Sequence, residues 1–120
     1  MTMEERILAL AAGIVGGEPS ALLRSLCAAA EAAWRGRLRP GVEVEACGEA
    51  FCCGVAFTAA ADCLLAQSGG EIAAFTAGAV SVRTREGGGE ALAAALRLTA
   101  ERLMAPYAQT EDFHFQGVMG

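Results

Sequence analysis

The sequence predicts a mainly α-helical fold, a small four-helix bundle, and three observations support that fold class. Alanine, which loses no side-chain entropy in a helix, makes up more than a fifth of the 120 residues. Apolar residues recur at three- and four-residue spacing in several separate stretches. The stretch 46–66 is apolar nearly all round, which predicts a buried central helix. Residues 1–120 are expected to form a single domain.

Two helices are predicted before the central one. Thr2 and Glu5 match the T-x-x-E capping box, and the apolar spacing that follows predicts a first helix over about Met3–Val15. Gly16-Gly17 ends it, and Pro19 is expected in the first turn of a second helix that runs to about residue 37. The apolar stripe of this second helix comprises Leu23, Leu26, Cys27, Ala30 and Trp34.

The charges suggest a solvated surface and no nucleic-acid site. Glu31 and Arg35 are expected to pair at i,i+4 on the outside of the second helix. With Arg37 and Arg39, Arg35 forms a basic cluster that we expect to be a solvated helix end. A net charge of −5 argues against binding to a specific nucleic-acid sequence.

The central helix is expected over about Ala46–Ala66 and should end at Gln67-Ser68-Gly69-Gly70, where glycine suits a helix C-cap. Glu49 and Asp62 are its only charged residues. The run between them, in which Thr58 is the sole polar side chain, is too short to span a bilayer, so we expect a core helix and no membrane partner. The N-terminus is acidic where a signal peptide would be basic, so the chain is expected to stay in the cytosol.

A change of pattern follows the central helix. In Ile72–Arg85, valines and a threonine alternate with polar residues, which predicts a short β-hairpin or extended segment at about residues 72–85. A lone hairpin is marginal in water, so it should pack on the bundle or add to a neighbour's sheet.

The last helix and a tail complete the prediction. Gly87-Gly88-Gly89 is expected to be a flexible hinge, and Glu90 to start the fourth helix, with Arg97 and Glu101 paired on its outer side. Its predicted core stripe comprises Leu92, Ala95, Leu96, Thr99 and Leu103. After Pro106, residues 111–120 are expected to form an extended tail, which either folds back on the bundle or docks on a partner.

No catalytic constellation is evident, so the protein is predicted not to be an enzyme and to need no cofactor. Glu49 and Asp62 lie too far apart on one helix to act on one bond. His114, the single histidine, lies in the tail. The five cysteines contain no C-x-x-C pair and are interpreted as small buried apolar side chains, without a metal site.

Three segments carry a more specific pattern. They are the helix pair LLRSLCAAAEAAWRGRL and CGEAFCCGVAFTAAADCLLA, the segment AAFTAGAVSVR at residues 73–83, and ERLMAPYAQTEDFHFQGVMG at residues 101–120. The second has a Phe-x-x-Gly-x-Val-Ser-Val rhythm, and the third combines Ala-Pro-Tyr with Phe-x-Phe-x-Gly-Val. Together they resemble the small head-tail connector (adaptor or head-completion) proteins of tailed bacteriophages and prophages.

The resemblance implies a non-enzymatic structural virion protein. Such proteins form a ring of about a dozen copies below the portal, and link the phage head to the next connector or tail component. It implies assembly in the bacterial host cytoplasm and a final place at the head-tail junction. An apolar fraction of 54% is compatible with surfaces buried between subunits. Our candidate partner interface comprises Phe75, Val80, Val82, Arg83, Phe113, Phe115 and Val118.

A second hypothesis comes from the cysteines alone. Cys47, Cys52, Cys53 and Cys63 lie on the central helix, and a small cytosolic helical module could use them to bind a metal or a thiol-reactive ligand. Metal analysis of protein purified without chelator separates this hypothesis from the connector.

Overall fold

The computed structural model describes the backbone of residues 2–74 and 80–109, and the side chains of 2–67 and 89–109. The four helices are α1 (Met3–Val15), α2 (Ala21–Arg37), α3 (Gly48–Ala74) and α4 (Val80–Met104), with a short 3-10 helix, η1 (Val44–Cys47), before α3. The predicted mainly helical, four-helix architecture is confirmed. Among the described residues the one β-type contact is an isolated antiparallel bridge between Leu38 and Ala108.

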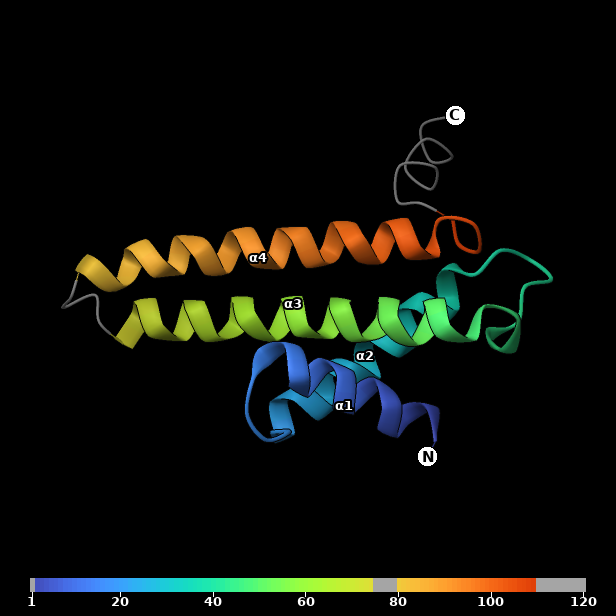
Figure 1. Ribbon diagram of the computed structural model, residues 1–120, viewed down its shortest axis with the longest axis horizontal. Coiled ribbons are helices and arrows are strands. Elements are labelled where there is room, and N and C mark those ends of the chain that lie inside the picture. The colour runs from blue at the N-terminus through green and yellow to red at the C-terminus, as the bar shows by residue number, and fades with distance from the viewer. Residues whose placement is uncertain (1, 75–79, 110–120) are drawn as a thin grey trace.

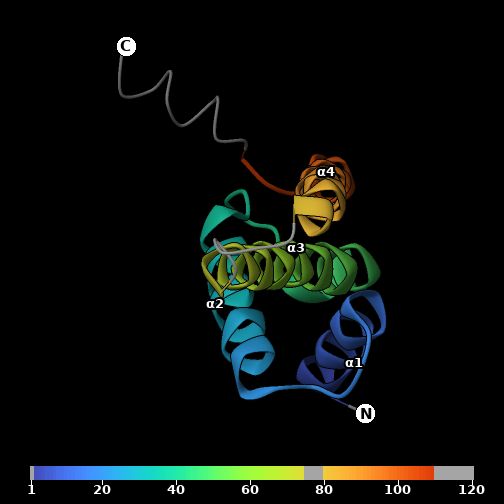
Figure 2. The same cartoon turned by 90° about the vertical axis from the view of Figure 1, so that its left-hand side faces the viewer.

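Helix α3 lies in the middle of the molecule (Figure 1). Helix α4 runs antiparallel along one side of α3, while α1 and α2 pack against the other side. Seen along α3, α1 and α2 lie on the same side of it, one at each edge, and a loop joins them away from α3 (Figure 2). Because α3 contacts all three other helices, it needs an apolar surface in nearly every direction, as its sequence indicated.

The first two helices begin at side-chain caps. The hydroxyl of Thr2 accepts the backbone N–H of Glu5, whose carboxylate accepts the N–H of Thr2 in return, so the predicted capping box is confirmed. Helix α2 begins after Ser20, whose hydroxyl accepts the N–H of Leu23 at 3.1 Å. Pro19 therefore precedes the cap and does not lie in the first turn, because the serine side chain satisfies a free N–H that proline cannot.

The core is centred on the first half of α3. Phe51, Cys52, Val55, Ala56 and Ala59 are fully buried there. From the other helices, the core receives Ile7, Ala11, Leu23, Cys27, Ala30, Trp34, Ala100 and Met104.

The polar groups inside this core are paired. The indole N–H of Trp34 donates to the hydroxyl of Thr58 at 2.9 Å, and that hydroxyl donates to the carbonyl of Gly54. Thr58, the one polar uncharged side chain in the middle of α3, is thus satisfied without water.

The hairpin expected at about residues 72–85 is not confirmed. Residues 72–74 belong to α3, which continues past its predicted end at Gly69-Gly70, and residues 80–85 belong to α4; residues 75–79 lie outside the described part. Extending an existing helix costs much less than nucleating one, whereas an isolated hairpin has little to stabilise it. A six-residue alternation is therefore too weak a signal when long helices flank it on both sides.

The glycine hinge is also corrected. Gly87-Gly88-Gly89 lies within α4, which begins seven residues before the glycines, at Val80, instead of at Glu90. Each glycine costs a helix about 1 kcal/mol relative to alanine, which weakens a helix without forcing it to end.

In the part of the chain that the structure describes, one stretch meets a length and composition criterion for crossing a membrane. It spans Val44–Gln67, and half of its most apolar window is buried inside the fold. The core helix of a soluble bundle meets the same criterion, so the absence of a membrane partner stays a prediction.

Candidate partner-binding surfaces

The predicted interface residues do not form a strand pair. Val80, Val82 and Arg83 lie at the start of α4 with helical backbone. The remaining members, Phe75, Phe113, Phe115 and Val118, lie outside the described residues. Residues 80–83 are therefore not a strand that could pair with the edge of a neighbour's sheet.

Helix α4 presents its apolar stripe away from the core. Among the α4 side chains that the structure describes, from residue 89 on, the buried ones are Ala93, Ala100 and Met104, and they pack toward α3. The stripe predicted to be core lies about 100° around the helix from these three, at 100° per residue. We call it the outer stripe of α4, and it comprises Leu92, Ala95, Leu96, Thr99 and Leu103.

The outer stripe is exposed to different degrees along its length. Leu92 is 46% exposed, Ala95 and Thr99 are exposed, and Leu96 and Leu103 are half-buried. The small side chains of Ala93 and Ala100 allow α4 to approach α3 closely, and the bulkier leucines are left on the outside. The expectation that this stripe forms core was wrong, because a short interhelical distance selects small residues rather than the largest apolar ones.

Ion pairs between helices fix this rotation of α4. The predicted i,i+4 pair of Arg97 with Glu101 does not form. Arg97 instead pairs with Asp62 of α3, and Glu101 accepts two hydrogen bonds of 2.8 Å from the guanidinium of Arg37 in α2. The two-point pair of Arg37 with Glu101 has a defined geometry, and together with the single contact of Arg97 with Asp62 it holds α4 with its outer stripe turned away from α3.

The basic cluster holds the segment that follows α4. Arg37 donates through Nε to the carbonyl of Gln109 at 2.8 Å, and its guanidinium lies 4.2 Å from the Trp34 ring centre. Arg39 donates to the carbonyls of Ala105 and Ala108 at 3.3 Å. The interpretation as a solvated helix end was therefore incomplete, because two of the three arginines anchor residues 105–109 against the end of α2.

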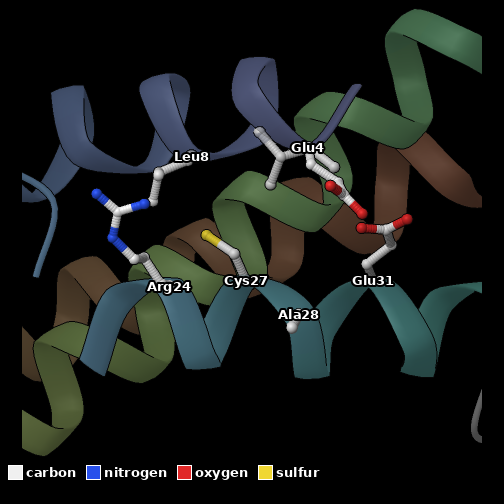
Figure 3. A pocket seen from close by; sticks show the side chains of 7 residues that line it. Glu4, Leu8, Arg24, Cys27, Ala28 and Glu31 are labelled. Carbon is white, nitrogen blue, oxygen red and sulfur yellow. The ribbon is translucent and has the colours of Figure 1, made fainter. Parts of the chain in front are cut away.

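A groove lies between α1 and α2 (Figure 3). Its volume is about 290 Å³, and it is lined by Glu4, Ile7, Leu8, Arg24, Cys27, Ala28 and Glu31. Figure 3 shows the guanidinium of Arg24 near one end and the carboxylates of Glu4 and Glu31 near the other. The groove was missed at the sequence level because it depends on the angle between two helices, which no local pattern encodes.

The cysteines pack as small apolar side chains. Cys27, Cys47, Cys52 and Cys63 are buried, Cys53 is partly buried, and all five are free thiols. Burial is the largest cause that raises the thiol pKa of the four buried residues above its usual value. A raised pKa keeps a thiol protonated, the form that is a poor nucleophile and a poor metal ligand. Within the described ranges, no three histidine, cysteine or acidic side chains gather as a metal site.

Replacing Cys63 with serine is expected to destabilise the fold by about 1–3 kcal/mol, because the serine hydroxyl would be buried without a hydrogen-bond partner. Cys63 is 1% exposed. The matched control is Cys53→Ser on the same helix, where partial exposure should limit the loss to about 0.5 kcal/mol. Urea denaturation of both variants measures the difference, and equal losses would contradict the burial of Cys63.

Comparison with known proteins does not supply a relative from which site residues could be transferred. The chain matches no protein-family model, no curated protein sequence and no solved structure. The assignment of these surfaces therefore rests on the chain's own residues.

Proposed function

We propose that the protein is a non-enzymatic structural component of a tailed phage or prophage, a head-tail connector that assembles as a ring below the portal. Its partners would be further copies of itself, the portal protein, and the next connector or tail component. It would assemble in the bacterial host cytoplasm and act at the head-tail junction. The sequence resemblance of residues 22–38, 47–66, 73–83 and 101–120 supports the phage context.

The outer stripe of α4 is the observation that carries the proposal. Leu92, Leu96 and Leu103 recur at helical spacing on a side of α4 that the described residues cover only in part, with Leu92 exposed and Leu96 and Leu103 half-buried. A row of leucines facing water is unfavourable, and a protein–protein contact would remove it from water. In a ring, each subunit meets its two neighbours through two different surfaces, so this stripe would pack against another face of the next copy.

The charge of the chain supports the same function. The net charge is −5, so the protein lacks the electrostatic attraction to phosphates on which tight DNA binding depends. A connector that surrounds a DNA channel must let the DNA pass without holding it.

The proposal predicts that the outer stripe controls self-association. The variant Leu92→Glu/Leu96→Glu should weaken it by at least about tenfold, because the interface would have to bury two charges. Leu98→Glu is the matched control: Leu98 is 51% exposed on the same helix but lies about 120° around it from Leu92. It should assemble like the natural chain.

Sedimentation velocity across protein concentrations, with and without the portal ring encoded in the same genome, measures this association. Negative-stain images of the assembled fraction should show closed rings. A chain that stays monomeric at every concentration and does not bind the portal would overturn the proposal. Equal losses in both glutamate variants would place the interface elsewhere.

A further inference from the structure

The α1–α2 groove has features that select its occupant. Its lining is apolar along the middle, through Ile7, Leu8, Cys27 and Ala28. Arg24 at one end has no ion-pair partner among the described residues. Glu4 and Glu31 make the other end acidic. A ligand that fits this distribution carries acidic groups at one end, followed by apolar side chains.

We infer that this groove binds residues 111–115 of a neighbouring copy, an inference that rests on the proposed ring. That segment reads Glu-Asp-Phe-His-Phe, with two acidic residues directly before two aromatic ones. In an extended strand, Phe113 and Phe115 point to the same side and can both face the apolar lining. Repulsion from Glu4 and Glu31 sets the direction, with Glu111 and Asp112 at the Arg24 end.

The lengths of groove and segment agree. Arg24 and Glu31 are seven residues apart on α2, which corresponds to about 10 Å along the helix axis. From Asp112 to Phe115, three extended residues also cover about 10 Å. With Asp112 beside Arg24, Phe113 therefore lies over the apolar part of the groove, and Phe115 reaches the end marked by Glu31.

The geometry favours a neighbouring copy over the same chain. Gln109 is hydrogen-bonded to Arg37 through its N–H and its carbonyl, so the start of the segment is fixed at the C-terminal end of α2. Arg24 lies thirteen residues earlier on that helix, about 20 Å away along the axis. The three residues from Gln109 to Asp112 span only about 10 Å when extended. A neighbour's segment is free of this limit.

Charge reversal tests the contact. A fluorescently labelled synthetic peptide of residues 110–120 is titrated into the full-length protein, and binding is followed by anisotropy. Arg24→Glu should weaken binding by at least about tenfold, because an attraction becomes a repulsion. A peptide carrying Glu111→Arg and Asp112→Arg should recover binding to the Arg24→Glu protein. The control is Arg102→Glu, which reverses an exposed arginine on α4 outside the groove.

Mixing full-length variants then identifies which chain supplies the segment. Arg24→Glu chains and chains carrying Glu111→Arg/Asp112→Arg should each self-associate poorly, because within each variant like charges meet. In their mixture, every contact between unlike chains joins a groove and a segment of opposite charge. The mixture should therefore recover association, with the two variants alternating, and the triple variant with all three changes should recover it alone. Recovery in the triple variant without recovery in the mixture would show that the segment binds its own chain, and would overturn the inference.

Two outcomes separate this inference from the proposed function. If rings form and the Arg24→Glu protein binds peptide and assembles like the natural chain, the groove assignment is wrong and the connector proposal stands. If peptide binding depends on Arg24 but the protein neither forms rings nor binds the portal, the groove contact stands and the connector proposal falls. Circular dichroism of each variant confirms that the fold is retained.

Discussion

Replacing Phe51 with alanine is expected to lower the free energy of unfolding by about 3–5 kcal/mol. Phe51 is fully buried at the start of α3 and belongs to the core cluster shared by α1, α2 and α4. Removing its ring leaves a cavity that the surrounding helices cannot fill, and takes away the surface over which the Arg35 guanidinium lies, 5.5 Å from the ring centre. Urea denaturation followed by circular dichroism measures the loss.

Phe57→Ala is the matched control, because it deletes the same ring from the same helix at a position that is only partly buried. It should cost about 1–2 kcal/mol, in proportion to the smaller apolar area that leaves water on folding. The comparison cancels differences in helix propensity, since both variants replace phenylalanine with alanine in α3. Equal losses at the two positions would contradict the placement of Phe51 at the centre of the core.

The sequence predicted those elements whose signals are local. The capping box at Thr2 and the apolar spacing after it located α1 over Met3–Val15, and the polar-poor stretch 46–66 indicated the buried middle helix. A cap is formed by residues three apart, and periodic burial follows from the helix itself. Neither depends on where another helix lies.

The errors occurred where tertiary contacts decide between local alternatives. The alternating Val-Ser-Val-Arg sequence at residues 80–83 is compatible with a strand, but its backbone forms the start of α4. Arg97 and Glu101 have suitable spacing to pair with each other, yet Asp62 and Arg37 on other helices are better placed. The spacing of residues along a helix determines which side chains can contact each other, and the packing of the helices determines which of these contacts form.

The candidate surfaces show the same division. The leucines of the outer stripe were recognised as one apolar face, and the error was in what covers that face. The groove between α1 and α2 and the anchoring role of Arg37 and Arg39 were not recognised, since both involve residues far apart in sequence. The sequence therefore predicted that these residues form one apolar face of the helix, but only the fold shows that this face is turned toward solvent.

Replacing Gly54 with valine is expected to destabilise the fold by about 3 kcal/mol, because it separates the two longest helices. A Cβ atom at this position would lie 2.9 Å from Cγ of Met104 and 3.9 Å from the carbonyl of Ala100. The branched side chain of valine adds two methyl groups in the same space. Gly54→Ala should change stability by less than about 1 kcal/mol, since the gain in helix propensity offsets a contact that Met104 can relieve by moving.

A double-mutant cycle identifies the contact responsible. Met104→Ala alone should cost about 2–5 kcal/mol, because Met104 is fully buried. If valine at position 54 destabilises by colliding with Met104, then Gly54→Val should cost at least about 1 kcal/mol less when Met104 is already alanine. The measurement is the free energy of unfolding of the two single variants and the double variant in urea. Additive losses would show that Met104 is not what valine at position 54 collides with, and would contradict the close contact of Gly54 with Met104 through which α3 and α4 pack here.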